Sequence, residues 1–310
     1  MTLAMVFPGQ GSQSQGMLGE LASEHAAIKD TFREASEVLG YDLWELVQDG
    51  PVEKLDETTF TQPAMLAAGV ATWRVWQAEG GKQPAAMAGH SLGEYTALVC
   101  AGAIDFTEAV RLVKIRAQLM HNAVPPGEGA MAAILGLDDQ AVRDVCSKAS
   151  STGIAEAANF NSPGQVVVAG ERAAIEQAIE LAREAGARRA IMLAVSVPSH
   201  SSLMQDAGEA LAESLETAAF NEPPITVINA VDAVPYGDAD DIRARLARQI
   251  ASPVRWVDTV QRLVADGADR IVECGPGKVL VGLIKRIDRS LPAICIDSPD
   301  SLGKAMEEGA

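Results

Sequence analysis

The chain has 310 residues, 48% of them hydrophobic, enough to bury one large core or a core with a smaller satellite domain. Its formal net charge of −17 argues against nucleic acid or an anionic membrane as a partner, because phosphate groups attract clustered Lys and Arg. Its apolar stretches, such as residues 65–73, fall well short of the roughly 18 residues that span a bilayer, so no membrane helix is expected.

The N-terminal residues 1–7 predict a first strand rather than a signal peptide, because they lack a basic start and end at Pro8-Gly9. The cysteines have neither metal-type nor disulfide-type spacing, which is typical of core residues in a reducing compartment. These cysteines are Cys100, Cys146, Cys274 and Cys295. We therefore expect a cytoplasmic location.

Strand-length apolar runs alternate with helical patterns over the first 120 residues and again after about residue 224. This alternation predicts an α/β fold with a mainly parallel sheet. The expected strands are 3–7, 85–88, 225–229, 270–273 and 293–296, and long helices are expected at 107–122 and 239–250. We assign residues 1–126 and 197–310 to a large α/β-hydrolase-like catalytic domain.

The order of expected helices and strands changes at Pro125-Pro126-Gly127, which predicts an inserted domain over residues 127–196. Its expected elements follow the order β-α-β-β-α-β, which is that of a small ferredoxin-like domain. They are a strand at 131–136, a helix at 138–148, strands at 154–160 and 165–169, a helix at 171–185 and a strand at 188–195.

The pentapeptide Gly89-His90-Ser91-Leu92-Gly93 is predicted to form a nucleophile elbow, because a strand of small residues precedes it and a helical pattern follows. The glycines permit a tight turn with close packing of strand and helix. Ser91 would then lie at the helix N-terminus, where backbone N–H groups can stabilise an oxyanion. The alternative is that Ser91 only caps the helix.

A serine hydroxyl needs a base within hydrogen-bond reach, and the chain offers four histidines. His25 lies in a polar stretch, His121 ends a helix, and the side chain of His90 diverges from Ser91 across the turn. His200 follows a turn at Pro198-Ser199 and is the candidate base, against the alternative of a capping or surface histidine. With no obvious third acid, a backbone carbonyl is expected to orient it.

The segment Phe7-Pro8-Gly9-Gln10-Gly11 follows the first strand but lacks the spacing of a nucleotide loop. A loop of this kind can donate the second oxyanion N–H in a serine acyl enzyme, so we expect the backbones of Gln10 and Leu92 to form the oxyanion hole.

Arg116 falls in the middle of the apolar face of the helix predicted at 107–122. A guanidinium directed inward must be paired, either with a distant Asp or Glu or with a substrate carboxylate. Further basic candidates for an anionic ligand are two surface groups, with solvated surface charge as the alternative. They are Lys278, Lys285 and Arg286, and the pair Arg188 and Arg189.

Taken together, the motifs resemble those of the malonyl-CoA:acyl carrier protein transacylases of fatty acid synthesis, along nearly the whole chain. The matching motifs are Phe7-Pro8-Gly9-Gln10-Gly11-Ser12-Gln13, Thr61-Gln62-Pro63-Ala64, Gly89-His90-Ser91-Leu92-Gly93-Glu94-Tyr95, Asn159-Phe160-Asn161-Ser162-Pro163-Gly164-Gln165, Pro198-Ser199-His200 and Glu273-Cys274-Gly275-Pro276-Gly277-Lys278.

The resemblance implies a role for each matching position. Ser91 would be the nucleophile, His200 the base, and the backbones of Gln10 and Leu92 the oxyanion hole. The family further implies that Arg116 binds the malonyl carboxylate, that Gln62 lines the acyl pocket and Asn159 supports the site, and that the Gln249 carbonyl orients His200.

It also implies malonyl-CoA as substrate, acyl carrier protein as partner and no cofactor, because exchange between thioester and ester needs neither metal nor redox chemistry. We further expect a monomer and no nucleic acid or membrane partner. A serine thioesterase or carboxylesterase with the same elbow is the alternative, and a non-enzymatic carrier-docking module is a third possibility. An inward-facing Arg116 argues against a hydrolase of neutral acyl groups.

Overall fold

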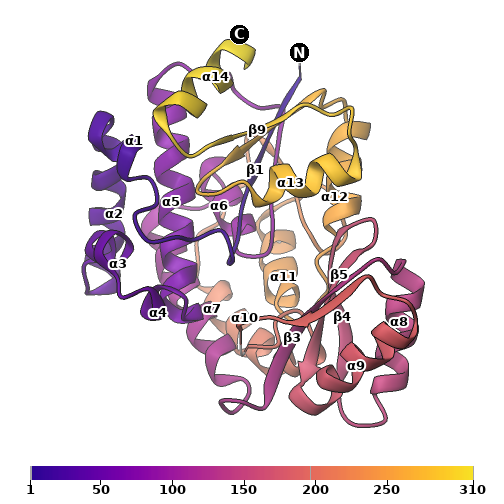
Figure 1. The fold of residues 1–310 in the computed structure, drawn as a ribbon. Helices are drawn as coiled ribbons and strands as arrows, with labels where there is room; N and C mark the ends of the chain where they lie inside the picture. The colour runs from indigo at the N-terminus through magenta and orange to yellow at the C-terminus, as the bar shows by residue number, and fades with distance from the viewer. Residues whose placement is uncertain (1, 196, 310) are drawn as a thin grey trace.

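A sheet of five parallel strands, in the order β7-β2-β1-β8-β9, forms the centre of the larger part of the molecule (Figure 1). The computed structural model describes residues 2–195 and 197–309. The strands are β1 (Leu3–Phe7), β2 (Ala86–Gly89), β7 (Thr226–Ile228), β8 (Arg270–Cys274) and β9 (Ala293–Ile296). The prediction of an α/β fold with a mainly parallel sheet is confirmed.

Helices cover both faces of this sheet, because alternate side chains of its buried strands point to opposite sides. Met5 and Phe7 join the core that contains α5, α6 and α7, whereas Ala4 and Val6 join the core that contains α12 and α13. The helices are α1 (Gly19–Glu24), α2 (Ala26–Leu39), α3 (Leu43–Asp49), α4 (Val52–Leu55), α5 (Thr58–Ala78), α6 (Gly93–Cys100), α7 (Phe106–Asn122), α10 (Gln205–Glu216), α11 (Ala239–Gln249), α12 (Trp256–Ala265), α13 (Val279–Ile287) and α14 (Pro299–Gly309).

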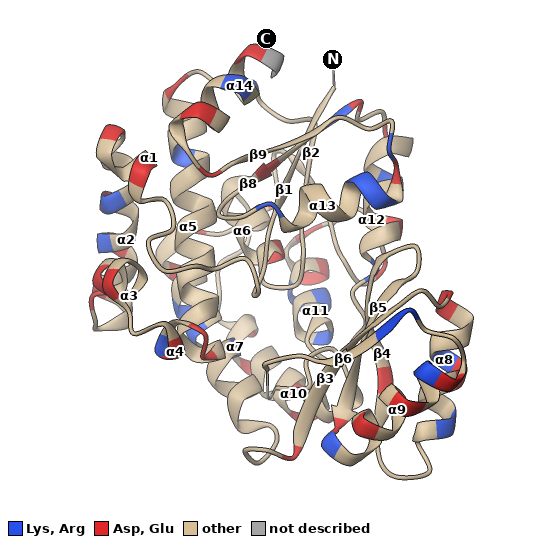
Figure 2. Cartoon of the chain, in the orientation of Figure 1, with Lys and Arg blue, Asp and Glu red and all other residues tan. Residues whose placement is uncertain are grey.

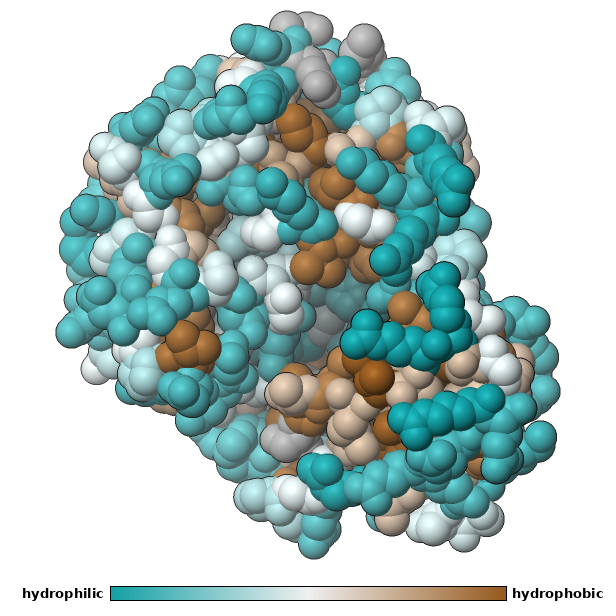
Figure 3. All heavy atoms as spheres, in the orientation of Figure 1, coloured by the Kyte–Doolittle hydropathy of each residue, from teal (hydrophilic) through white to brown (hydrophobic). Residues whose placement is uncertain are grey.

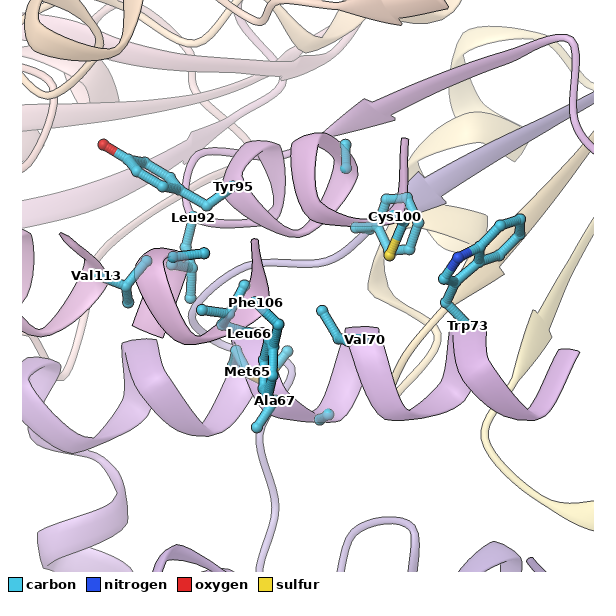
Figure 4. Close-up of a cluster of buried hydrophobic side chains, with 14 of the residues drawn as sticks. Met65, Leu66, Ala67, Val70, Trp73, Leu92, Tyr95, Cys100, Phe106 and Val113 are labelled. Atoms are coloured by element: carbon cyan, nitrogen blue, oxygen red, sulfur yellow. The ribbon is translucent and has the colours of Figure 1, made fainter. Parts of the chain in front are cut away.

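The helix that follows Ser91, α6, packs closely on α5 (Figure 4). Leu66 and Val70 of α5 belong to the same buried cluster as Cys100 of α6. At Gly69 a Cβ would lie 2.6 Å from Cγ2 of Thr96, so the Thr96 side chain of α6 packs directly against the backbone of α5. Among the described residues, no helix is both long and apolar enough to pass through a bilayer.

A second sheet is antiparallel, with the order β4-β5-β3-β6, and lies below the first in the view of Figure 1. Helices α8 and α9 pack on one face of it. Its elements are β3 (Gly129–Leu135), α8 (Asp139–Ala149), β4 (Ala155–Ser162), β5 (Gln165–Glu171), α9 (Arg172–Glu184) and β6 (Arg189–Met192). Strand β6 ends at Met192, three residues before the predicted end at 195. The Leu193 amide still donates to the Met131 carbonyl over 2.9 Å, and Leu193 and Val195 border a cavity.

Backbone hydrogen bonds join the second sheet to the larger part of the molecule. The amide of Phe160 in β4 donates to the carbonyl of Val254 over 2.9 Å, and the amide of Val254 donates to the carbonyl of Ala158 over 2.8 Å. Glu156 also accepts hydrogen bonds from the amide and the hydroxyl of Ser202. The second sheet is therefore attached close to residues 199–203, which contain His200.

Gly93 is expected to tolerate no side chain. A Cβ there would lie 2.1 Å from the Phe7 carbonyl oxygen and 2.9 Å from that of Pro8, and neither backbone atom can rotate away. We expect Gly93→Ala to lower the free energy of unfolding by about 2 kcal/mol or more, since overpacking in a close-packed interior costs about 1–3 kcal/mol. Denaturant titration measures the change.

The matched control is Gly282→Ala in the exposed part of α13, where a Cβ would meet nothing within 4 Å. This variant should gain roughly 0.5–1 kcal/mol, because alanine has a higher helix propensity than glycine. A Gly93→Ala protein as stable as the parent would contradict the close-approach argument.

Candidate active site

Ser91 lies in the tight turn between β2 and α6. Its φ of 53° is in the left-handed region, which residues other than glycine rarely adopt. At Gly89 a Cβ would lie 1.9 Å from the carbonyl carbon of Gly93, so strand and helix can meet here only without that side chain. This local geometry is that of a nucleophile elbow, and Ser91 borders a cavity.

His200 is brought to Ser91 from 109 residues away, and its Nε2 lies 2.7 Å from the Ser91 Oγ. On the other side of the ring, Nδ1 faces the carbonyl oxygens of Gln249 at 3.0 Å and Ser252 at 3.1 Å. Because both of these groups are acceptors, Nδ1 carries the proton of the neutral ring and Nε2 accepts from the serine hydroxyl. The pair has the geometry of a nucleophile and its general base.

The environment of His200 favours its neutral form. The side chain is buried, and burial lowers the pKa of the imidazole to about 3, with the positive charge of Arg116 acting in the same direction. The two backbone carbonyls oppose this shift but do not cancel it. His200 is thus ready to accept a proton at neutral pH.

Gln10 and Leu92 border the same cavity as Ser91. The loop that contains Gln10 lies against the elbow, because a Cβ at Gly9 would be 2.5 Å from the His90 carbonyl oxygen and 3.8 Å from the Leu92 amide nitrogen. The Gln10 side chain turns to Thr58, to which its Nε2 donates over 3.2 Å. The two backbones are therefore adjacent beside Ser91.

Arg116 projects from α7 into the same cavity and is 1% exposed. Its Nη1 donates to the Gln62 Oε1 over 2.5 Å, and its Nη2 donates to the Gln249 Oε1 over 2.9 Å and to the Ser91 Oγ over 3.2 Å. All these partners are neutral, and within residues 2–195 and 197–309 no carboxylate lies within ion-pair distance of Arg116. The interior-facing position predicted for Arg116 is thus observed, without the structural ion pair that was its alternative.

Gln62 and Asn159 also border the cavity. Gln62 belongs to α5. Its Oε1 accepts from Arg116, and its Nε2 lies 3.5 Å from the sulfur of Met120. Asn159 belongs to β4, and its buried Oδ1 has no hydrogen-bond partner among the described residues. Both residues therefore line the cavity that Ser91 borders.

Sequence reasoning missed the side chain of Gln249 and two residues behind it, Glu94 and Tyr236. The Gln249 Nε2 donates to the Glu94 Oε2 over 2.5 Å and to the Ser91 carbonyl oxygen over 2.9 Å. The hydroxyl of Tyr236 donates to the other oxygen of Glu94. Only Glu94 carried a signal in the sequence, because it follows the elbow within the same motif.

His90 serves a different purpose from His200. Its Nε2 lies 2.8 Å from the Oδ1 of Asn161 in β4, and its ring lies 5.5 Å from that of Trp256. The elbow is thus linked directly to the second sheet. The other two histidines, His25 and His121, do not border the cavity.

The predicted basic candidates lie outside the cavity lining. Lys278 immediately precedes α13, whereas Lys285 and Arg286 lie in its last turn (Figure 2). Arg286 donates to the side-chain oxygen of Gln165 at the start of β5, which brings α13 next to the second sheet. No cluster of three or more His, Cys, Asp or Glu in the described part of the chain could hold a metal ion.

The cavity has a volume of about 230 Å³ and lies between the two sheets. In the space-filling view of Figure 3, apolar side chains gather on both sides of a hollow between the larger and smaller parts of the molecule. Much of the apolar lining comes from α13 on one side and from the second sheet and the segment after it on the other. These residues are Val279, Leu280, Leu283, Met131, Val167, Leu193 and Val195. Among the polar groups that line the cavity, His200 and Arg116 both contact the Ser91 hydroxyl.

Comparison with known proteins identifies the family. The profile of the acyl transferase domain matches residues 4–297. Malonyl CoA-acyl carrier protein transacylases of Haemophilus influenzae and Escherichia coli K12 are 54% and 52% identical to this chain, and each alignment covers 98% of both proteins. The chain belongs to this transacylase family. The Bacillus subtilis 168 relative is 44% identical over 98% of this chain and 96% of its own length.

Solved structures agree with this assignment. An acyl carrier protein S-malonyltransferase from Vibrio cholerae superposes with a TM-score of 0.95 at 55% identity, covering 98% of this chain and 99% of that one. The malonyl-transacylase PlMCAT, solved in complex with the type II PKS acyl-carrier protein AntF, superposes with a TM-score of 0.98 at 52% identity, covering 99% and 100%. The resemblance seen in the sequence motifs is confirmed.

We expect the His200 imidazole to stay neutral from pH 8 down to about pH 5, because protonation would add a buried charge beside Arg116. An unfolded histidine takes up its proton near pH 6.5. Below that pH the unfolded chain therefore binds more protons at this position, and the free energy of unfolding should fall as the pH decreases from about 6.5 towards about 3.

An NMR titration of the ring signals measures the midpoint, with His200→Gln to assign them. In this variant the part of the acid destabilisation that comes from residue 200 should disappear. A His200 midpoint at pH 6 or above would show that burial does not control this group.

Proposed function

We propose that this chain transfers a malonyl group from malonyl-CoA to the phosphopantetheine thiol of an acyl carrier protein, through a malonyl ester on Ser91. One observation carries the proposal: a buried guanidinium and a buried imidazole both contact the same serine hydroxyl, at 3.2 Å and 2.7 Å. The names of the related transacylases support the same activity. It would supply malonyl units for fatty acid synthesis.

In the first half-reaction, the Ser91 Oγ attacks the thioester carbonyl carbon while His200 Nε2 takes the hydroxyl proton. The carbon–sulfur bond then breaks, and His200 returns the proton to the departing coenzyme A thiolate. In the second, His200 takes the proton of the carrier thiol, whose sulfur attacks the ester carbonyl carbon. The carbon–oxygen bond to Ser91 then breaks, and His200 returns the proton to the Ser91 Oγ. We assign the oxyanion of both tetrahedral intermediates to the backbone N–H groups of Gln10 and Leu92.

We assign recognition of the malonyl carboxylate to Arg116. Its guanidinium already contacts the Ser91 hydroxyl, so an acyl group on that oxygen would project its own carboxylate towards the same fork. Gln62 would line the acyl pocket from α5, Asn159 would support the site from β4, and the Gln249 carbonyl would orient His200. We propose that the reaction needs no metal or redox cofactor, because a thioester and an ester exchange without either.

We further propose that residues 1–126 and 197–310 form an α/β-hydrolase-like domain and residues 127–196 a ferredoxin-like subdomain. The β-α-β-β-α-β order and the strand order β4-β5-β3-β6 support the second assignment. We also propose that Lys278, Lys285 and Arg286 dock the acyl carrier protein. A monomeric state, a cytoplasmic location and the absence of nucleic acid or membrane partners stay predictions.

Intact-mass measurement after mixing with malonyl-CoA tests the proposal. We expect one stable malonyl adduct, which disappears when a carrier protein with a phosphopantetheine thiol is added. Ser91→Ala is the control and should form no adduct. Rapid release of free malonate would instead mean a hydrolase, and an unmodified protein would mean that the site is not catalytic.

Arg116→Ala tests the carboxylate assignment. We expect malonyl transfer to fall about 30-fold or more, because a charge-assisted pair in a buried site contributes about 2 kcal/mol or more. Transfer of the neutral acetyl group should survive or improve. Rates of acylation by malonyl-CoA and acetyl-CoA give both values, and Arg111→Ala on the half-exposed side of α7 should change neither. An equal loss with both substrates would remove Arg116 from substrate recognition.

A further inference from the structure

Three buried side chains form a hydrogen-bonded chain behind Arg116, which we call the Glu94 relay: Tyr236, Glu94 and Gln249. Glu94 and Gln249 are 0% exposed and Tyr236 is 7% exposed. Tyr236 donates to one carboxylate oxygen of Glu94, and the Gln249 Nε2 donates to the other over 2.5 Å. The Gln249 Oε1 then accepts from Arg116 over 2.9 Å. The relay therefore ends on the guanidinium next to Ser91.

Glu94 determines which way the Gln249 amide faces. Both N–H groups of this amide are used, one by Glu94 and one by the Ser91 carbonyl oxygen, so only its oxygen is left for Arg116. If the amide were rotated by a half turn, its NH₂ group would face the guanidinium and its oxygen would face the carboxylate. Two donors would then face each other at Arg116 and two acceptors at Glu94, which costs free energy in a buried site.

The relay also explains how the buried cation of Arg116 is balanced without a direct ion pair. Burial lowers the pKa of Arg116, and the Coulombic effects of Tyr95 and Glu94 oppose this shift, although Glu94 is separated from Arg116 by an amide. A direct ion pair would occupy the N–H groups that a substrate carboxylate needs. Burial raises the pKa of Glu94 to about 7, and the hydrogen bonds from Tyr236 and Gln249 oppose that rise and favour the ionised form.

We propose that Glu94 is a positioning residue for recognition of the acyl carboxylate: through the Gln249 amide it holds the Arg116 guanidinium beside Ser91 without forming an ion pair with it. The inference rests on the proposed function of Arg116. Glu94 itself borders neither Ser91 Oγ nor the cavity, so it acts only through the relay.

The test compares Ser91 acylation by malonyl-CoA and by acetyl-CoA in three variants. Glu94→Leu removes the acceptor, and Gln249→Met removes the amide but keeps the main-chain carbonyl that faces His200. Each should reduce malonyl transfer at least about 10-fold relative to acetyl transfer. Glu94→Gln can still accept from Gln249 and can donate to the Tyr236 oxygen, so it should restore the ratio to within about threefold of the parent.

Glu273→Leu is the matched control, because Glu273 is also a 0% exposed carboxylate but binds the backbone amides of Leu280 and Val281 instead of the relay. It should leave the malonyl-to-acetyl ratio unchanged even if it lowers stability. If Glu94→Leu does not fold, Gln249→Met and Tyr236→Phe decide the question, with a shift towards acetyl supporting the relay.

Equal losses of malonyl and acetyl transfer in Glu94→Leu and Gln249→Met would overturn the inference, since they would indicate a structural role alone. The outcome for Arg116→Ala separates the two hypotheses. If Arg116→Ala changes the ratio and the relay variants do not, only the relay is wrong. If Arg116→Ala leaves the ratio unchanged, the assignment of Arg116 as the carboxylate receptor fails first.

Discussion

The positive charge of Arg116 is the constraint on which the rest of the site depends. A bare guanidinium in a protein interior is costly by several kcal/mol, so a chain that buries one must surround it with acceptors. Here the acceptors are two amide oxygens and a hydroxyl, contributed by α5, α11 and the elbow. Three segments far apart in sequence thus meet around one cation, and none of them neutralises it by direct contact.

The same low-polarity surroundings act on the neighbouring imidazole. Burial and the adjacent cation both disfavour a protonated His200, and the two carbonyls on Nδ1 define its tautomer. Carbonyls orient the ring without adding a negative charge next to the position proposed for the malonyl carboxylate. A site that recognises an anion therefore gains from a serine-histidine pair without a third acid.

Local sequence was enough to predict Ser91 and Arg116, but not the Glu94 relay or the first helices. Ser91 could be identified from the sequence because the turn itself requires the glycines at 89 and 93. Arg116 was found because a cation interrupts an apolar helix face. The relay could not be found, because Tyr236 and Gln249 lie 142 and 155 residues from Glu94 and nothing local marks them as its partners. The five helices before residue 79 were not assigned either, and the longest, α5, is buried nearly all round and so lacks an amphipathic period.

The backbone pairing between β4 and Val254 ties the smaller sheet to the segment that begins at Gln249. That segment supplies both carbonyls that hold the imidazole, and β4 also carries Asn161, which reaches the elbow through His90. The strand that borders the cavity and the segment that positions His200 are therefore held together by hydrogen bonds. A chimera that took β3 to β6 from a relative to alter acyl preference would also realign the base, unless residues 249–254 were grafted with them.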